Sequence, residues 1–290
     1  MIKRLIVLAA LAVFAGGLMG GCGKNEGDAA KKEVKMEGST TVLPLVMEWT
    51  HAFQKKNEGM KIILTGTGSG AGIKSLIDGT VGCAMSSRKI KDDEKKQCKD
   101  KGFDAVEHEV AWDCLTFIVS KDNPMSEITK EQLAAIYTGG AKTWKEAVPD
   151  LNFDQKIVVV TREQSSGTFE YFNESILEKK KLRDDAQSVQ SSQDVINLVA
   201  QTKGAVGYVG VGYYIANQNK VKALKFKSDA DGKYYMPTDY GKYPVTRPLF
   251  LYSKGQPAGI LADFIKFALS EEGQQIVDKA GFIPLAKIKQ

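Results

Sequence analysis

Three short stretches of the chain combine hydroxyl groups, glycine and, in one case, arginine where a helix is expected to begin. They are "EGSTTVLPL" near residue 40, "TGTGSGAGIKSLIDG" near residue 69 and "TREQSSGTFEYF" near residue 166. Serine and threonine before a helix cap free N–H groups, and glycine lets the backbone approach a ligand closely. Helix N-termini with free N–H groups favour anions. These residue types therefore predict binding of a small anion.

The stretch at residues 161–172 adds a permanent cation to this pattern. Arg162 carries a planar set of donors that suits a tetrahedral oxyanion, and Ser166, Gly167 and Thr168 follow it at the expected helix start. Taken alone, Arg162 is equally compatible with a surface salt bridge. Taken together, the three stretches predict separate turns that converge on one anion.

Known phosphate-binding motifs do not match the glycine-rich stretch. A dinucleotide fingerprint that starts at Gly66 needs glycine at position 71, which is Ala71, and a P-loop needs glycine directly before Lys74, where Ile73 stands. A nucleophile elbow needs glycine where Thr67 stands. We therefore expect neither a nucleotide site nor this type of hydrolase site.

The elements that must position these stretches alternate along the chain. Apolar strand-like runs are expected at 61–65, 81–86, 114–120, 156–160, 205–210 and 248–253. Helices are expected between and after them, at 44–56, 72–78, 130–137, 168–179, 193–201, 261–269 and 271–280. This alternation predicts an α/β fold with mainly parallel sheets, whose ligands bind at the carboxyl ends of strands.

The N-terminus has the pattern of an export signal. Lys3 and Arg4 precede an apolar run that is too short to span a membrane comfortably, and "LMGGC" ends at Cys22. This end resembles the lipobox of bacterial lipoproteins, which implies a signal peptide at 1–21 and a lipidated (palmitate-carrying) Cys22. The small, charged residues 22–33 are expected to form a flexible tether. A plain signal peptide with an incidental cysteine is the alternative.

Charge and the remaining cysteines set further limits. The net charge of +5 over 290 residues, without long basic blocks, argues against nucleic acid as a partner. Three cysteines beyond Cys22, at 83, 98 and 114, allow at most one disulfide among them, and the sequence does not decide whether one forms. No cluster has the spacing of a metal site, and no cofactor is expected.

The ordered set of motifs resembles a known family. The three stretches, together with "VGCAMSSRKI", "TRPLFLYSKG" and "EEGQQIVDKAGFIPL", resemble the phosphate-binding lipoproteins of bacterial phosphate ABC transporters over nearly the whole mature chain. The resemblance implies a two-lobed Venus flytrap, the periplasmic-binding-protein fold, in which each lobe is a mainly parallel sheet flanked by helices. It places lobe one at 34–112 and 247–290 and lobe two at 113–246, with hinge crossings near 111–113 and 243–247.

The resemblance also implies a function and a site. The protein would be a monomeric, non-enzymatic binding protein, exported and lipid-anchored in the cell envelope, that captures inorganic phosphate between its lobes and delivers it to membrane permease subunits. The implied phosphate-binding residues are Ser39, Thr40, Thr41, Ser69, Ser87, Arg88, Arg162, Ser166, Gly167 and Thr168.

Two positions depart from the family pattern. Ser87 stands where well-known members have an aspartate that accepts the proton of hydrogen phosphate, and Gln164 stands where some have an aspartate that steers the arginine. Arg88 either adds charge near the ligand or pairs with a carboxylate such as Asp92. Sulfate and arsenate therefore stay open as ligands.

Two other classes of protein are less consistent with the sequence. A phosphate-ester hydrolase lacks support because the only histidines, His51 and His108, do not neighbour a serine-rich turn. An extracellular sensor or adhesin on the same fold has no additional domain in its favour. Turnover of a chromogenic phosphate ester would distinguish a hydrolase from a binding protein.

Overall fold

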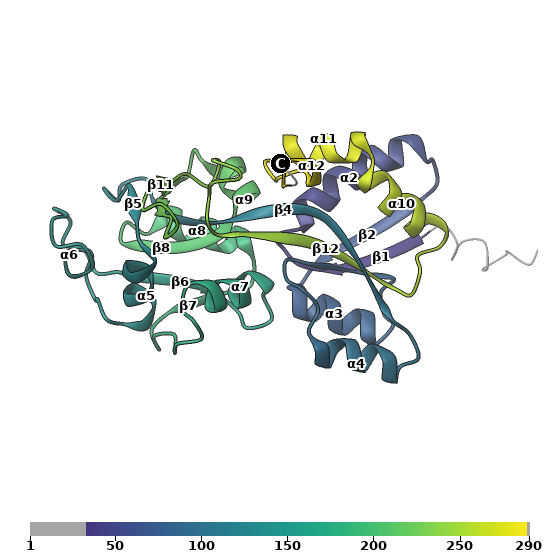
Figure 1. Ribbon diagram of the computed structural model, residues 1–290, viewed down its shortest axis with the longest axis horizontal. Coiled ribbons are helices and arrows are strands. Elements are labelled where there is room, and N and C mark those ends of the chain that lie inside the picture. Colours follow the sequence, from purple (N-terminus) through teal and green to yellow (C-terminus); the bar gives the residue numbers. More distant parts are fainter. Residues whose placement is uncertain (1–32, 289–290) are drawn as a thin grey trace, which may run out of the picture.

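Two lobes are joined by a pair of long strands (Figure 1). The computed structural model describes residues 33–288. The long strands β4 (Ala105–Ser120) and β12 (Thr246–Lys254) pair antiparallel and belong to one sheet, ordered β2-β1-β3-β12-β4-β8-β6-β7, that runs through both lobes. The predicted two-lobed α/β fold is confirmed.

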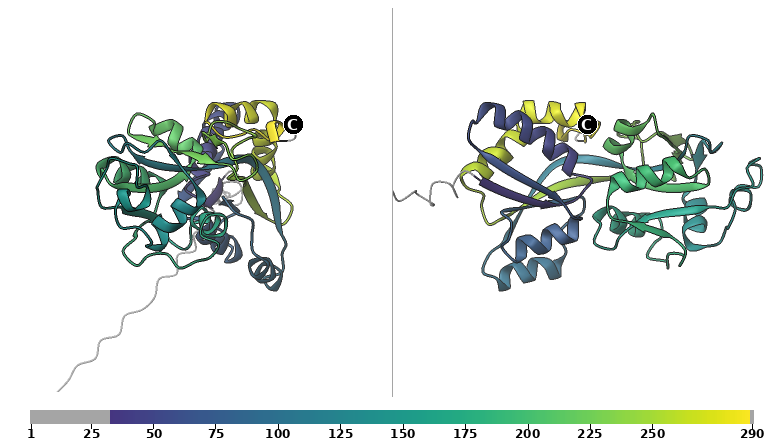
Figure 2. Two further views of the ribbon diagram at one scale, coloured as in Figure 1. Left: turned by 60° about the vertical axis from the view of Figure 1, so that its left-hand side comes forward. Right: turned by 180° about the vertical axis from the view of Figure 1, so that it is seen from behind.

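The first lobe is built on a parallel core of three strands. β1 (Glu33–Gly38) lies between β2 (Lys61–Gly66) and β3 (Cys83–Ser86), and β12 adds to β3 in the antiparallel direction. Alternate strand residues face opposite layers of helices, as the pleat requires. Met85 packs in the cluster with helices α2 (Leu43–Lys56), α10 (Gly259–Leu269) and α11 (Glu271–Lys279). Ala84 packs with α3 (Ser69–Ile77) and α4 (Asp92–Asp100), on the other side of the sheet (Figure 2).

The second lobe has the same layered plan. β8 (Ala205–Gly210) pairs with β4 and with β6 (Val158–Arg162), which in turn pairs parallel with β7 (Gln187–Val189). Val160 faces α8 (Ser192–Gln201), and Val159 faces the cluster that includes α5 (Lys130–Thr138) and α7 (Gly167–Ser175). The shorter elements are α6 (Trp144–Ala147), α9 (Val211–Asn217), α12 (Leu285–Ile288), β5 (Glu127–Ile128), β9 (Val221–Ala223), β10 (Lys225–Lys227) and β11 (Tyr234–Tyr235).

The lobes meet where β4 and β12 cross between them. Asp113 on β4 is the register partner of Arg247 on β12, and the register shifts between Leu249 and Phe250, which marks a bulge near the crossing. Asp113 and Arg247 lie within the hinge crossings that are expected from the sequence, at 111–113 and 243–247. We therefore keep the proposed lobe limits, 34–112 with 247–290 and 113–246.

The structure also describes the three cysteines beyond Cys22, but it does not describe the N-terminal segment. Cys83, Cys98 and Cys114 are buried, free thiols, and burial raises the pKa of Cys83. No helix between residues 33 and 288 combines the length and apolar composition needed to cross a bilayer. The predicted signal peptide, Cys22 and nearly all of the tether lie outside the described residues.

Candidate functional site

The turn between β1 and α2 holds the first three predicted residues. Ser39, Thr40 and Thr41 are at most 4% exposed. Ser39 Oγ accepts hydrogen bonds from the N–H groups of Thr41 and Val42 at 3.2 and 3.4 Å. Gly38 is required before them, because its φ is +139° and a Cβ would lie 2.1 Å from the Met85 carbonyl oxygen. The backbone thus fixes this turn and leaves the two threonine hydroxyls free to point elsewhere.

Ser69 and Ser87 form the second part of the site. Ser69 is the first residue of α3 and is fully buried, and Ser87 follows β3 directly. The Ser87 N–H donates to Ser69 Oγ at 3.1 Å, and the two hydroxyl oxygens lie 3.3 Å apart. Both side chains therefore sit at carboxyl ends of lobe-one strands.

The third part begins α7 in lobe two. Ser166 Oγ accepts from the Phe169 N–H at 3.3 Å and caps the helix, and Gly167 and Thr168 are buried in its first turn. N–H groups in the first turn of a helix have no acceptor within that helix. Those of Gly167 and Thr168 are thus available to a ligand.

These parts converge across the two lobes. Thr41 Oγ1 lies 2.8 Å from Thr168 Oγ1. The Gly70 N–H donates to the Ser165 carbonyl at 2.9 Å. A Cβ placed on Gly167 would lie 2.5 Å from Ser69 Oγ, so the lobes approach closely enough to require glycine there. The sequence motifs, far apart in the chain, meet at one junction as expected.

Arg162 is a buried cation at this junction. It is 2% exposed, and it donates to the carbonyl oxygens of Val189 and Gln190 at 3.3 and 2.5 Å and to Ser192 Oγ at 3.2 Å. Within residues 33–288 no carboxylate lies within 4.0 Å of its guanidinium. Burial lowers its pKa, since removal from water disfavours the charged form. An anion beside Arg162 would supply the missing counter-charge.

Ser192 lies at the same junction, although it is not among the residues predicted from the sequence. It is fully buried at the start of α8, its Oγ lies 3.3 Å from Thr40 Oγ1, and it accepts from Arg162. The signal was present: "SSQDV" places two serines at a helix start, with Ser191 as a capping residue. Gln164, which stands where some family members have an aspartate that steers the arginine, is exposed. In this protein the Ser192 hydroxyl and the carbonyl oxygens of Val189 and Gln190 hold Arg162.

Arg88 lies beside the junction and pairs with two carboxylates. Glu94 accepts from both of its terminal nitrogens at 2.7–2.8 Å, and Glu170 of α7 lies 3.0 Å from its Nε. The expected pairing with a carboxylate is present, with Glu94 in place of Asp92. Because Glu170 belongs to lobe two, Arg88 connects the lobes.

A buried ion pair supports the site from the crossing strands. Arg247 donates from Nε and Nη2 to Asp113 Oδ2 at 3.1 and 2.9 Å, and the two side chains are 2% and 0% exposed. Arg247 also donates to the Gly167 carbonyl and to Thr168 Oγ1 at 3.3 and 3.0 Å. From the sequence, Arg247 was expected only at the edge of a hinge crossing and not among the anion-binding residues.

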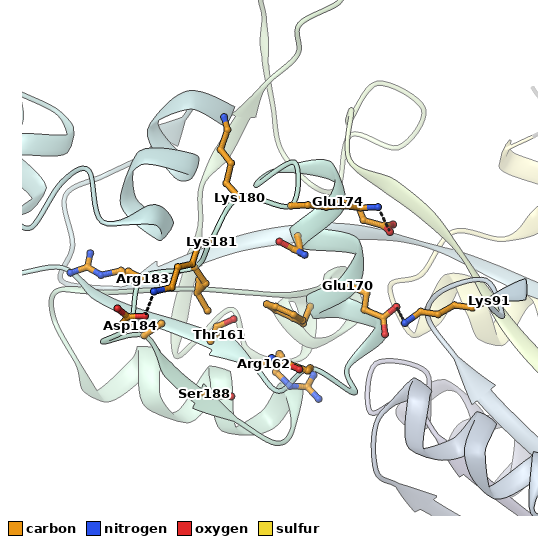
Figure 3. Close-up of a pocket in the computed structure, with 16 residues that line it drawn as sticks. Lys91, Thr161, Arg162, Glu170, Glu174, Lys180, Lys181, Arg183, Asp184 and Ser188 are labelled. Atoms are coloured by element: carbon orange, nitrogen blue, oxygen red, sulfur yellow. Dashed lines mark ion pairs between the residues drawn. The ribbon is translucent and has the colours of Figure 1, made fainter. Parts of the chain in front are cut away.

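A basic groove of about 940 Å³ adjoins Arg162 and is lined by lobe-two residues together with Lys91 of lobe one. Figure 3 shows Lys180, Lys181 and Arg183 around it, with ion pairs that join Lys181 to Asp184 and Lys91 to Glu170. Because carboxylates balance most of these cations, the groove lacks the unmatched positive charge of the buried site.

The histidines lie away from the junction. His51 is exposed on α2, and His108 on β4 lies 2.9 Å from Ser253 Oγ. Burial lowers the pKa of His108. Among residues 33–288 no group of three metal-ligating side chains comes together. The geometry is that of an anion site made from hydroxyls, N–H groups and Arg162, which has no carboxylate partner among residues 33–288.

Comparison with known proteins agrees with this geometry. The family model described as a PBP superfamily domain matches residues 23–272. The phosphate-binding protein PstS of Staphylococcus epidermidis is 36% identical over 93% of this chain and 86% of its own length, and that of Staphylococcus aureus is 34% identical over 92% and 84%.

Solved structures give the same result. A phosphate ABC transporter substrate-binding protein from Clostridium perfringens, solved with bound phosphate, is 32% identical with a TM-score of 0.76 over 87% of this chain and 99% of that one. An ABC-type phosphate transport receptor from Vibrio cholerae is 28% identical, with a TM-score of 0.65 over 87% and 99%. The chain therefore belongs to the PBP superfamily and, within it, to the PstS family of phosphate ABC transporter substrate-binding proteins.

Proposed function

We propose that the protein captures inorganic phosphate between its lobes and delivers it to the permease of an ABC transporter. The observation that carries this proposal is Arg162, a cation that is 2% exposed and has no carboxylate within 4.0 Å among the described residues. An isolated buried charge is costly, so a partner of opposite charge is strongly favoured. A phosphate dianion between the lobes meets this requirement.

Helix N-termini supply the remaining donors. The first turns of α3, α7 and α8 and the turn at 39–41 present hydroxyls and N–H groups from both lobes to one place. Partial positive charge at a helix N-terminus stabilises an anion without full neutralisation by side chains. Hydrogen bonds to a charged group contribute about 1.5–3 kcal/mol each, so several are sufficient for micromolar or tighter binding.

Binding proceeds by closure of a hinge. Phosphate first meets the lobe-one residues Thr40, Ser69 and their neighbours. Lobe two then swings about β4 and β12 and brings Arg162, Ser192 and the start of α7 to the ligand. Contacts that form only in the closed state drive this change.

The relatives support this assignment over its alternatives. They are named for phosphate binding and transport, and one was solved with phosphate bound. Arsenate has the same shape and charge, while sulfate lacks the proton that hydrogen phosphate carries. A hydrolase is disfavoured because neither histidine is near the junction, and a chromogenic phosphate ester should stay intact when incubated with the protein.

The setting in the cell is part of the proposal. The protein is exported, anchored through a lipid on Cys22 and tethered by residues 22–33, and it works as a monomer in the cell envelope, on the periplasmic side or the outer surface of the cytoplasmic membrane. Cys22→Ser tests the anchor: the variant should take up no lipid label and should be released from membranes, whereas the wild-type protein should carry the label and stay bound.

Calorimetry of the purified protein with phosphate, arsenate and sulfate in turn tests the ligand. Arg162→Ala should weaken phosphate binding by at least about 100-fold, because the charge-assisted contacts are lost while the fold remains. Lys180→Ala removes an exposed cation of the same lobe and serves as the control. Near-normal affinity of the Arg162 variant, with its thermal unfolding unchanged, would rule out Arg162 as the anion-binding residue.

A further inference from the structure

Two arginines of the site are arranged in the same way. Arg162 donates to Ser192 Oγ, which lies 3.3 Å from Thr40 Oγ1. Arg247 donates to Thr168 Oγ1, which lies 2.8 Å from Thr41 Oγ1. Each arginine thus contacts a hydroxyl at a helix start in lobe two, and that hydroxyl faces a threonine of lobe one.

The two arginines differ in their charge balance. Among residues 33–288 Arg162 has no carboxylate partner, whereas the charge of Arg247 is neutralised by Asp113 in a buried pair. Asp113 Oδ1 in turn accepts from the Val211 N–H at 2.9 Å, so both carboxylate oxygens are occupied. Arg247 therefore adds little net charge to the site, and its effect there must be geometric.

The geometric effect is on the Thr168 hydroxyl. An arginine can only donate hydrogen bonds, and a hydroxyl has one proton. With Arg247 Nη2 at 3.0 Å occupying one lone pair of Thr168 Oγ1, the proton is directed away from the guanidinium, toward Thr41 and the space between the lobes. A second bond from Arg247 to the Gly167 carbonyl fixes the backbone of the same turn.

We propose that Arg247, held by Asp113, is a positioning residue that presets the Thr168 hydroxyl as a donor to the bound anion. The proposal rests on the proposed function. Asp113 and Arg247 are register partners on the crossing strands β4 and β12. The hydrogen bonds of Arg247 to Gly167 and Thr168 therefore connect the first turn of α7 directly to the hinge. The donor then keeps its direction while the lobes close.

A double-mutant cycle between Arg247 and Thr168 tests the proposal. Arg247→Lys keeps the charge beside Asp113 but loses the planar fork that reaches Asp113, Gly167 and Thr168 together. Thr168→Val keeps the shape of the side chain and removes its hydroxyl. We expect Arg247→Lys to weaken phosphate binding about 10-fold in the wild-type background and less than about 2-fold in the Thr168→Val background, since coupled residues are not additive.

The matched control is Arg183→Lys. Arg183 uses the same fork, with Asp185 and the carbonyls of Ile136 and Ala141, and within the described residues none of its hydrogen bonds is to a residue of the junction. The Arg183→Lys substitution should leave phosphate affinity unchanged in both the wild-type and the Thr168→Val backgrounds. Equal losses from Arg247→Lys in the two backgrounds, or no loss in either, would overturn the positioning role.

Two further measurements keep the outcomes distinct. If Arg247→Lys does not fold, the neutral pair Asp113→Asn/Arg247→Leu replaces it in the cycle, because removing both charges leaves no unpaired buried ion. The loss of phosphate affinity caused by Asp113→Asn/Arg247→Leu must likewise vanish in the Thr168→Val background, or the proposal fails. Wild-type protein is titrated alongside: absence of phosphate binding there refutes the proposed function, whereas additivity with normal wild-type binding refutes only the role of Arg247.

Discussion

At the scale of single residues, different side chains provide the positive charge of the site and its directed hydrogen bonds. Arg162 provides a buried positive charge that has no carboxylate partner in the described part of the chain, while hydroxyl groups of Thr40, Thr41, Thr168 and Ser192 provide directed donors. A hydroxyl can donate and accept, so a site made of hydroxyls places few limits on the protonation state of its ligand. Selectivity between oxyanions therefore depends on the least constrained hydroxyl.

Ser87 is that hydroxyl. Within residues 33–288 its hydrogen bonds are with Ser69 alone, through its own N–H at 3.1 Å and its Oγ at 3.3 Å, and no arginine there donates to its hydroxyl. We expect Ser87→Asp to weaken sulfate binding at least about 10-fold more than phosphate binding at pH 7.5, since a carboxylate accepts the proton of hydrogen phosphate and repels an anion without one.

Calorimetry with both anions checks this expectation. Ser87→Asn, which has the same shape without the charge, is the control and should change both affinities alike. If Ser87→Asp and Ser87→Asn give the same ratio of phosphate to sulfate affinity, Ser87 does not govern the choice.

At the scale of elements, much of the site follows from local sequence. Glycine and hydroxyl residues at the starts of α3 and α7, after β2 and β6, predicted anion-binding turns at the carboxyl ends of strands, and the structure brings these turns together. The helix α4 could not be predicted from periodicity, because its sequence DDEKKQCKD buries only Cys98. The predicted helix at 168–179 ends earlier, at Ser175, and Glu178 and Lys179 adopt positive φ.

The ion pair between Arg247 and Asp113 could not be predicted from the sequence, for a different reason. Asp113 and Arg247 lie 134 residues apart, and only the pairing of β4 with β12 brings them together. Ser192, by contrast, carried the same helix-start signal as the selected serines. Local patterns therefore predict which groups bind, whereas long-range strand pairing decides what orients them.

The start of α7 offers a test of how closely the elements must approach. A Cβ on Gly167 would lie 2.5 Å from Ser69 Oγ and 2.9 Å from Ser87 Oγ, both in lobe one. We expect Gly167→Ala to weaken phosphate binding at least about 10-fold with little loss of thermal stability, because the added methyl group obstructs closure and not the folding of lobe two.

Calorimetry gives the affinity, and small-angle X-ray scattering with and without phosphate gives the extent of closure. Gly140→Ala is the matched control in the same lobe, since its Cβ would meet only ordinary contacts at 3.4 Å and beyond. Full closure of the Gly167→Ala protein at normal affinity would show that the lobes do not need this approach.

At the scale of the whole molecule, an ion-pair network spans the two lobes beside the site. Glu170 Oε2 on α7 lies 3.0 Å from Arg88 Nε and 3.0 Å from Lys91 Nζ, and Glu170 and Arg88 are 18% and 8% exposed as side chains. Both cations belong to lobe one. These contacts exist only while the lobes are together, so they stabilise the closed state relative to the open one.

Replacing Glu170 should therefore shift the balance of the two states. Glu170→Gln removes the carboxylate between Arg88 and Lys91, whereas Arg88 keeps its own-lobe partner Glu94 at 2.7 Å and the fold is retained. We expect phosphate affinity to fall about 3- to 10-fold, mainly through faster dissociation, because partly buried ion pairs contribute on the order of 1 kcal/mol. Stopped-flow measurement of phosphate release resolves the dissociation rate.

The chain offers a close control for this prediction. Glu174 lies one turn further along α7 and pairs with Lys179 of its own lobe at 3.9 Å, so Glu174→Gln changes the same helix by the same chemistry but removes an ion pair within lobe two. Raising the salt concentration should reduce the difference between wild-type protein and Glu170→Gln, since screening weakens the contact that only the wild type has. Equal dissociation rates for the two variants would mean that closure is held by the ligand and the hinge alone, with no contribution from the Arg88–Glu170–Lys91 network.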